Sequence, residues 1–340
     1  MTKITEYLEI LLEGGDLKYN QAKDLLDTIF NGDVAEVQIA AFLAAMRMKK
    51  ATPNEFAGLA QSLRNHAVKV TTKIPYLIDT CGTGGAPLKT FNVSTAAALI
   101  AAGAGAYVAK HGNRGITSKS GSADVLEAMG VKIDCPSEIV VDCIENAHIG
   151  FMFAPMHHPA MKFVQPIRKS LDFRTAFNIL GPLANPAGAQ GQVMGVPDES
   201  LLDRIADTFK ILGTKRVMIV HSSGLDEISI TSPSKIVEVT GGKKISYEIH
   251  PDDFGIKSPK MAELAGSNAE YNAGLIKEIL SGKNKTPARD MVLLNTAAAI
   301  IVAGLADDFH QAFKKAAESI DSGAAMQCLE KLIAISNGKS

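Results

Sequence analysis

The feature that most constrains the fold is a change of hydrophobic pattern near residue 72. Before it, apolar residues recur at the three- and four-residue spacing of helices, as in QAKDLLDTIF and VAEVQIAAFLAAMRM. After it, short apolar runs alternate with helical stretches along most of the remaining chain. Such alternation is typical of a mostly parallel sheet with helices on both faces. We therefore predict an α/β fold class, with a small α-helical domain and a larger α/β domain.

The domain boundaries are predicted from the same change. Residues 1–71 form the small helical domain, and residues 72–162 and 189–340 form the large α/β domain. Segment 163–188 breaks the strand–helix rhythm with helix signals and prolines, so we expect it to complete the helical domain. The first predicted strand is YLIDT (Tyr76–Thr80), and three helices are predicted to close the chain, from MVLLNTAAAIIVAGLA to AAMQCLEKLIAIS. The stretch ATPNEF predicts a capping box.

Composition excludes several classes of protein. The chain has 340 residues, of which 46% are hydrophobic, so it can bury a substantial core. A formal net charge of −1 argues against a nucleic-acid binder. No apolar run reaches the roughly 18 residues of a membrane span, so we expect no membrane partner. The four cysteines have no metal-site spacing, which indicates a reduced, cytoplasmic protein.

Two glycine-bearing loops carry the functional signal. The first lies in DTCGTGGAPLKTFNVSTA (79–96) and the second is KHGNRGITSKSGS (110–122); each follows a predicted strand and precedes a helix. In the first loop, both the Walker pattern and the dinucleotide pattern require a glycine where Pro87 stands. Residues 80–123 contain no Asp or Glu, but they carry several lysines, hydroxyl groups and amides. This composition favours an anion as the ligand of both loops.

The expected position of the loops suggests which anion. In an open parallel sheet both loops would lie at the carboxyl ends of strands, where such folds bind ligands. Helix N-termini would add unpaired amides and a partial positive charge. Two such sites side by side suit a ligand with two separate phosphate groups. A purely structural role in close helix–sheet packing remains open from these residues alone.

Several longer motifs resemble a known family. Together, GTGG…TFNVSTA, VAKHGNRGITSKSGSADVLEAMG, IRKSLDFRTAFNILGPLANP and GLDEIS closely resemble the anthranilate phosphoribosyltransferases, over nearly the whole chain. The resemblance implies a helical domain that mediates a homodimer, and a larger α/β domain. It also implies an enzyme of tryptophan biosynthesis that joins anthranilate to the ribose of 5-phosphoribosyl 1-diphosphate and uses Mg²⁺.

The resemblance implies roles for individual residues. Binding of the phosphoribosyl donor falls to Gly82, Gly85, Thr90, Asn92, Val93, Ser94, Thr95, Lys110, His111, Gly112, Asn113, Arg114, Gly115, Ile116, Thr117, Ser118 and Ser122. Contact with anthranilate falls to Gly82, His111, Asn113, His158 and Arg168. Binding of magnesium falls to Ser94, Asp226 and Glu227.

Catalysis is expected to need no acid–base residue, because the amine of anthranilate is already neutral at pH 7. Lys110 and Arg168 are expected to stabilise charge instead, and Arg174 is interpreted as structural. One departure from the family concerns Ala86-Pro87, which stands where the family has Asp-Gly and which puts the metal requirement in question. We hypothesise that Lys89, which follows it, partly substitutes for the charge of the metal.

Three alternative functions remain. A pyrimidine-nucleoside phosphorylase is the nearest enzymatic one, although KHGNR argues against it. A non-catalytic relative that binds nucleic acid would carry a basic excess, but 35 Lys and Arg face 36 Asp and Glu. A phosphoribosyltransferase for another aromatic amine or acid is the third alternative, since Ala86-Pro87 could accompany a change of substrate.

Overall fold

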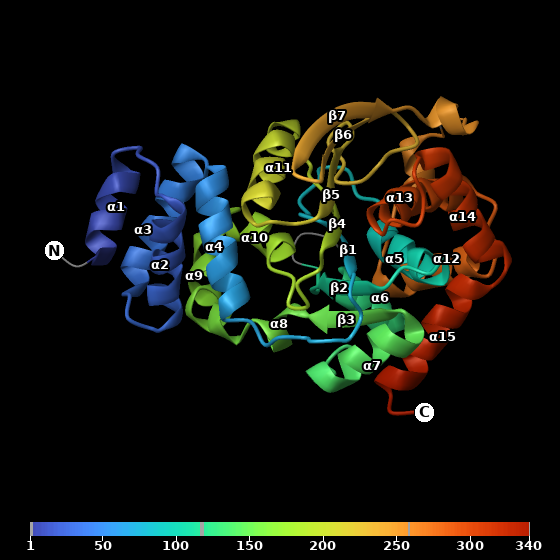
Figure 1. The fold of residues 1–340 in the computed structure, drawn as a ribbon, viewed down its shortest axis with the longest axis horizontal. Helices are drawn as coiled ribbons and strands as arrows, with labels where there is room; N and C mark the ends of the chain where they lie inside the picture. The colour runs from blue at the N-terminus through green and yellow to red at the C-terminus, as the bar shows by residue number, and fades with distance from the viewer. Residues whose placement is uncertain (1–2, 116–118, 258, 340) are drawn as a thin grey trace.

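The computed structural model describes residues 3–115, 119–257 and 259–339, and its first helices lie beside a sheet with further helices (Figure 1). The helices of the N-terminal region, and of the segment that returns to it, surround one apolar cluster. They are α1 (Lys3–Leu12), α2 (Tyr19–Phe30), α3 (Glu36–Lys49), α4 (Pro53–Asn65), the 3₁₀ helix η1 (Pro159–Phe163), α9 (Gln165–Leu171) and α10 (Phe177–Leu183). The short helix α8 (Ala154–His157) leads into the returning segment.

The sheet is doubly wound. Its strands are β1 (Ile78–Gly82), β2 (Val108–Gly112), β3 (Ile149–Phe153), β4 (Gly191–Gly195), β5 (Arg216–His221), β6 (Ser234–Thr240) and β7 (Lys243–Ile249). They form a seven-stranded sheet in the order β3-β2-β1-β4-β5-β6-β7. The strands from β3 to β5 are parallel, whereas β6 is antiparallel to both of its neighbours, β5 and β7. The order reverses between β1 and β4, and the carboxyl ends of strands at such a switch point are where open sheets bind ligands.

Helices cover both faces of this sheet (Figure 1). One face is covered by helices from several parts of the chain, and α11 packs on β5 and β6 on the other face. The remaining helices are α5 (Val93–Gly103), α6 (Ser122–Met129), α7 (Ser137–Ala147), the 3₁₀ helix η2 (Glu199–Leu201), α11 (Leu202–Ile211), the 3₁₀ helices η3 (Pro251–Phe254) and η4 (Met261–Leu264), α12 (Ala269–Leu280), α13 (Pro287–Val302), α14 (Phe309–Asp321) and α15 (Ala324–Ser336).

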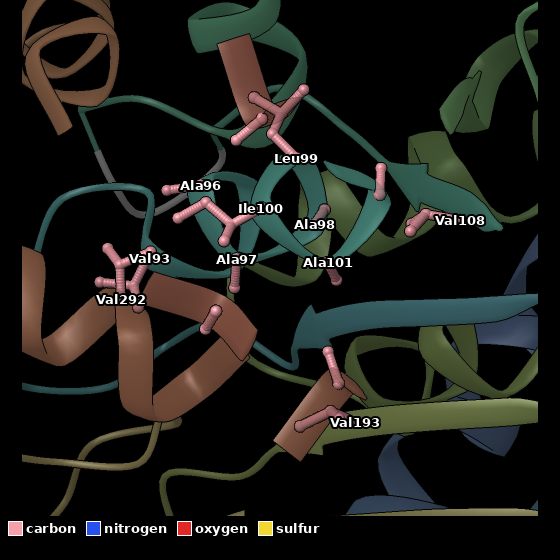
Figure 2. Packing of buried hydrophobic residues seen from close by; sticks show 14 of the residues in the cluster. Val93, Ala96, Ala97, Ala98, Leu99, Ile100, Ala101, Val108, Val193 and Val292 are labelled. Atoms are coloured by element: carbon pink, nitrogen blue, oxygen red, sulfur yellow. The ribbon is translucent and has the colours of Figure 1, made fainter. Parts of the chain in front are cut away.

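The two-residue period of the strands divides the core into two clusters. In β4, Val193 points into the cluster formed with α5 and α13, whereas Met194 points into the cluster shared with the N-terminal helices. Figure 2 shows the alanine-rich α5, whose Val93 lies beside Val292 of α13. The small side chains let the helix approach the sheet closely, so the loop before α5 is fixed on a rigid base.

The helical region is tied together by a buried carboxylate. Glu55 accepts hydrogen bonds from the amides of Leu17 and Thr52, at 2.9 and 2.7 Å, and from Lys49 Nζ at 2.7 Å. The Glu55 amide in turn donates to Thr52 Oγ1, so the capping box predicted from the sequence is confirmed. Val164 of the returning segment belongs to the same apolar cluster as α1–α4, which supports the predicted completion of the helical domain.

The predicted fold class is confirmed, with two differences in detail. The first strand begins at Ile78 and continues through Gly82, because Leu77 instead gives its amide to Gln190 Oε1. An additional helix, α12, precedes the three closing helices that were predicted. Among the described residues, no helix is long and apolar enough to cross a membrane. The domain boundaries at 1–71 and 163–188 stay a prediction.

Candidate active site

A cavity of about 350 Å³ lies at the carboxyl ends of β1 and β2. The two glycine-bearing loops form its walls, and further segments from beyond residue 150 complete them. Its lining residues are Cys81, Gly82, Thr83, Gly84, Gly85, Ala86, Leu88, Lys89, Thr90, Phe91, Asn92, Ser94, Thr95, Lys110, His111, Gly112, Asn113, Arg114, Gly115, Ser120, Gly121, Ser122, Ala154, Arg174, Asn178, Gly181, Pro182, Asp226 and Glu227.

The first glycine loop, residues 82–90, is held by two adjacent carboxylates. The Gly84 amide donates to Asp226 Oδ2 at 2.8 Å, and Thr90 Oγ1 donates to Glu227 Oε2 at 2.7 Å. Glycine is required beneath these contacts, because a Cβ on Gly82 would lie 2.3 Å from Asp226 Oδ2. Both predicted magnesium ligands from the GLDEIS motif therefore reach the cavity.

The described parts of the second glycine loop, residues 110–115 and 119–122, are held against α6. Asp124 Oδ2 accepts from the amides of Gly115 and Gly121, each at 2.8 Å. Arg114 donates to Asp124 and to Glu127, and these two carboxylates raise its pKa. The charge of Arg114 is therefore already paired, and it lies at the rim of the cavity.

Several amides of the two glycine loops are already paired with carboxylates. The Gly84 amide is paired with Asp226, and the Gly115 and Gly121 amides are paired with Asp124. Gly84 and Gly115 are exposed residues, and the carboxylates that accept from their amides, Asp226 and Asp124, lie outside the acid-free stretch. A phosphate would therefore have to replace a carboxylate to bind the Gly84 amide.

The two loops are joined to each other through Asn92. Its side-chain amide donates to the Ser120 carbonyl at 3.2 Å, and its Oδ1 accepts from Asn272 Nδ2 at 3.0 Å. The loops also share a buried polar network at the ends of their strands, where Lys110 Nζ donates to the Thr80 carbonyl at 2.6 Å. These bonds fix the width of the cavity.

Lys110 is a buried cation in the cavity wall. Burial lowers the pKa of Lys110, and the nearby Asp79 carboxylate opposes this change. Asp79 is fully buried and accepts from Asn185 Nδ2 at 2.8 Å and from the His111 amide at 3.3 Å. The strand end is thus set up to hold one positive charge close to a bound anion.

Asp226 and Glu227 form the acidic corner of the site. Burial raises the pKa of Asp226, while the Gly84 amide, Lys89 and Arg174 lower it. Burial, with the charge of Asp226, raises the pKa of Glu227 to about 8. Two neighbouring carboxylates that ionise reluctantly fit a divalent cation, which would favour their charged forms.

Two of the residues predicted to contact anthranilate lie outside the cavity wall. The His158 ring is buried and lies 5.0 Å from the ring of His111, which does line the cavity. Burial lowers the pKa of His158 to about 4 and that of His111 well below its ordinary value, so both are neutral at pH 7. Arg168 lies over the Phe177 ring, 5.4 Å from its centroid.

Four of the residues predicted to bind the phosphoribosyl donor are not among the described side chains that line the cavity. Val93 is fully buried in the apolar core, so only its backbone can face a ligand. The donor-binding roles predicted for Ile116, Thr117 and Ser118 lie outside the described residues.

Sequence reasoning missed several residues of the wall, above all Arg174. Its guanidinium lines the cavity and donates to the Gly84 carbonyl at 2.9 Å. Asn178, Gly181 and Pro182 from the same segment also line the cavity. They all belong to the motif DFRTAFNILGP, whose prolines and apolar residues indicated a helical crossover and hid its polar face.

Comparison with known proteins identifies the family. The sequence profile of the glycosyl transferase family, a/b domain, matches residues 75–326, and that of the helical bundle domain of the same family matches residues 5–67. Anthranilate phosphoribosyltransferase from Methanocorpusculum labreanum is 48% identical over 338 residues, with 99% of each chain covered. The chain belongs to the anthranilate phosphoribosyltransferase family. It is therefore a transferase of the glycosyl transferase class.

Solved structures of anthranilate phosphoribosyltransferases have the same fold. The enzyme from Thermus thermophilus superposes with a TM-score of 0.92 at 37% identity, covering 97% of this chain and 99% of its own. The enzyme from Saccharomyces cerevisiae, solved in complex with PRPP and Mg, superposes with a TM-score of 0.89 at 29% identity, covering 98% of both chains. The prediction of the family from the sequence is confirmed.

Proposed function

We propose that this chain transfers the phosphoribosyl group of 5-phosphoribosyl 1-diphosphate to the amine of anthranilate in the cavity between its two glycine loops. The new N–C bond forms at the anomeric carbon of the ribose as the bond from that carbon to the diphosphate oxygen breaks. The observation that carries this proposal is the convergence of both loops, Lys110 and the Asp226–Glu227 pair on one cavity at the switch point of the sheet.

Magnesium fits the acidic corner of this cavity. Asp226 and Glu227 offer carboxylate oxygens, the ligands that Mg²⁺ prefers, and Ser94, which lines the same cavity, offers a hydroxyl. A metal bound there would neutralise the charge that develops on the leaving diphosphate. Lys89 lines the same cavity and lowers the pKa of Asp226, so its proposed share in that neutralisation remains a prediction.

The residues of this chain would bind and orient the two substrates. The first loop offers the Gly84 amide and the Thr90 hydroxyl once their carboxylate partners release them, and Lys110 adds a buried positive charge. Charge stabilisation by groups that are already in place is the largest contribution expected for such a reaction. No described group of the wall is needed to activate the amine, because an aromatic amine is already uncharged at pH 7; the proton that its nitrogen loses once the N–C bond has formed goes to water or to the released diphosphate.

The direct test uses the fluorescence of anthranilate. Its emission should decay when purified protein, 5-phosphoribosyl 1-diphosphate and Mg²⁺ are combined, and one diphosphate should appear for each anthranilate consumed. Omission of the donor is the control. Phosphorolysis of a pyrimidine nucleoside with unchanged anthranilate emission would instead support the phosphorylase alternative.

Arg168 is proposed to bind the carboxylate of anthranilate. Its guanidinium lies over Phe177, with one hydrogen bond to Gln165 at 3.2 Å, so most of its donors are free among the described residues. The substitution Arg168→Ala should raise the KM for anthranilate roughly 10- to 100-fold, since a charge-assisted pair is lost. The KM for the donor should change less than about twofold in the same steady-state assay. Equal increases for both substrates would contradict this role.

Assembly and location are proposed from the surface and the cysteines. Leu12, Val37 and Met48 are large apolar side chains that are 65%, 77% and 85% exposed on or next to α1 and α3. Exposed apolar side chains of this size support a homodimer formed through the helical region. All four cysteines are unpaired, in keeping with the reducing cytoplasm that the sequence predicted.

A further inference from the structure

The guanidinium of Arg174 reaches the first glycine loop from a distant part of the chain. It lies between α9 and α10, and its Nη1 donates to the Gly84 carbonyl at 2.9 Å. A Cβ built on Gly85 would lie 1.1 Å from the same nitrogen. Any side chain at position 85 would therefore displace the guanidinium, so Arg174 can contact the loop only because residue 85 is a glycine.

Most of the hydrogen-bonding capacity of Arg174 is unused. A guanidinium has five N–H donors, and among the described residues Arg174 donates to the Gly84 carbonyl alone. No carboxylate of the described residues lies within 4.0 Å of it, although the charge of Asp226 acts on its pKa and opposes the lowering by burial. A half-buried cation without an ion-pair partner, in the wall of a cavity, is ready to accept an anion.

The helical region holds Arg174 in place. Arg47 of α3 donates to the Arg174 carbonyl, and the guanidinium of Arg47 lies 5.4 Å from the centroid of the Phe173 ring. The repulsion between Arg47 and Arg174 further lowers the pKa of Arg174, which an approaching anion would relieve. The backbone of Arg174 is thus braced from one side while its side chain faces the loop on the other.

We propose that Arg174 binds the diphosphate end of the phosphoribosyl donor and at the same time positions the first glycine loop around it. This inference rests on the proposed function, since it takes the donor to be the occupant of the cavity. The N–H groups of Arg174 that do not contact Gly84 bind the diphosphate. The hydrogen bond to the Gly84 carbonyl holds the first glycine loop in place beside it. Arg174 thereby couples donor binding to the helical region through Arg47.

The diphosphate suits Arg174 better than the carboxylate of anthranilate does. Arg174 contacts the first glycine loop at Gly84 and Gly85. Asp226 and Glu227, the acidic corner that fits Mg²⁺, contact the same loop at Gly84 and Thr90. A diphosphate bound by magnesium has charge left over for a cation on the other side of the loop. A single carboxylate carries less charge to share between a magnesium ion at the acidic corner and Arg174.

The test measures binding of magnesium pyrophosphate by calorimetry. The substitution Arg174→Gln should raise the Kd roughly 10- to 100-fold, the usual effect of losing a charge-assisted contact. The Kd of Arg174→Lys should lie between those of Arg174→Gln and the parent, because lysine keeps the positive charge but lacks the planar set of N–H donors. The KM for anthranilate should stay within about twofold of the parent value in both variants.

The matched control is Arg64→Gln. Arg64 also donates to a backbone carbonyl, that of Leu183 at 2.8 Å, but it lies away from the cavity. It should lower the melting temperature and leave the Kd for magnesium pyrophosphate unchanged. A Kd of Arg174→Gln within twofold of the parent, or equal increases of both KM values, overturns the inference. If the parent binds pyrophosphate through Arg174 but does not consume anthranilate, the proposed function fails, while the contact between Arg174 and a bound diphosphate stands.

Discussion

Replacing Glu227 with Gln is expected to stabilise the metal-free protein at pH 8 and to lower its turnover roughly 10²- to 10³-fold. Burial and Asp226 raise the pKa of Glu227 to about 8, from 4.5 for a free glutamate. Between these values the unfolded chain loses its proton more readily than the folded protein does. The free energy of unfolding of the parent therefore falls as the pH rises from 4.5 to 8.

Glutamine removes this dependence because it has no proton to lose. Thermal unfolding in EDTA should show a gain of about 2–4 °C for Glu227→Gln at pH 8, shrinking towards zero at pH 4.5. Added Mg²⁺ should stabilise the parent and not the variant, since the cation favours ionised carboxylates. A gain that is the same at both pH values, or full turnover in the variant, would contradict this interpretation.

The control for this experiment is another buried carboxylate. Glu55 lies outside the cavity wall and accepts from two amides and from Lys49, so Glu55→Gln removes the oxygen that accepts from the Thr52 amide and from Lys49. It should lower the melting temperature and leave the response to Mg²⁺ intact. The opposite signs of the two variants would separate an acidic site prepared for a cation from an ordinary structural carboxylate.

The second large effect is expected at Gly195, the last residue of β4. A Cβ there would lie 1.7 Å from the backbone oxygen of Asp226, and β1 and β5 hold β4 on both sides. Gly195→Ala must therefore push the Asp226 backbone outward. We expect a loss of about 1–3 kcal/mol in the free energy of unfolding and about 100-fold in turnover, because the carboxylate pair leaves its position.

Gly274→Ala is the matched substitution for this prediction. Gly274 lies in α12, and nothing is within 4 Å of the Cβ that would be added. Alanine is the better helix former, so this variant should gain roughly 0.5–1 kcal/mol and keep full turnover. Chemical denaturation and steady-state kinetics measure both variants. Unchanged Mg²⁺ dependence in Gly195→Ala would show that Asp226 is not held by the fit to β4.

The sequence predicted the elements well where local pattern decides them. Short apolar runs such as VMIV in the strands and helical spacing in the first 70 residues reflect burial, which the residue types reveal directly. Thr52 and Glu55 act over three residues, so their capping box was readable. The glycine loops were recognisable because their composition is unusual over a short stretch.

The contacts that shape the site could not be read in the same way. Asp226 and Gly84 are 142 residues apart, and Arg174 and Gly84 are 90 apart. No periodicity connects such pairs; they meet because the segments that follow β1 and β5 converge with the crossover segment at the carboxyl ends of the strands. For this reason the sequence alone favours a structural role for Arg174 and does not reveal the pairing of the Gly84 amide with Asp226. The short strand offset at Ile78 arose likewise from a side chain, Gln190, contributed by another strand region.

The hydrogen bond from Arg47 to the Arg174 carbonyl links α3 to the cavity as well as to the surface of the helical region. The helix that exposes Val37 and Met48, on which the proposed homodimer rests, also donates to the backbone of the residue whose guanidinium lines the cavity. Changes that tighten the proposed subunit contact would therefore alter substrate affinity, and an α/β portion expressed by itself would carry the loops without the helix that supports Arg174.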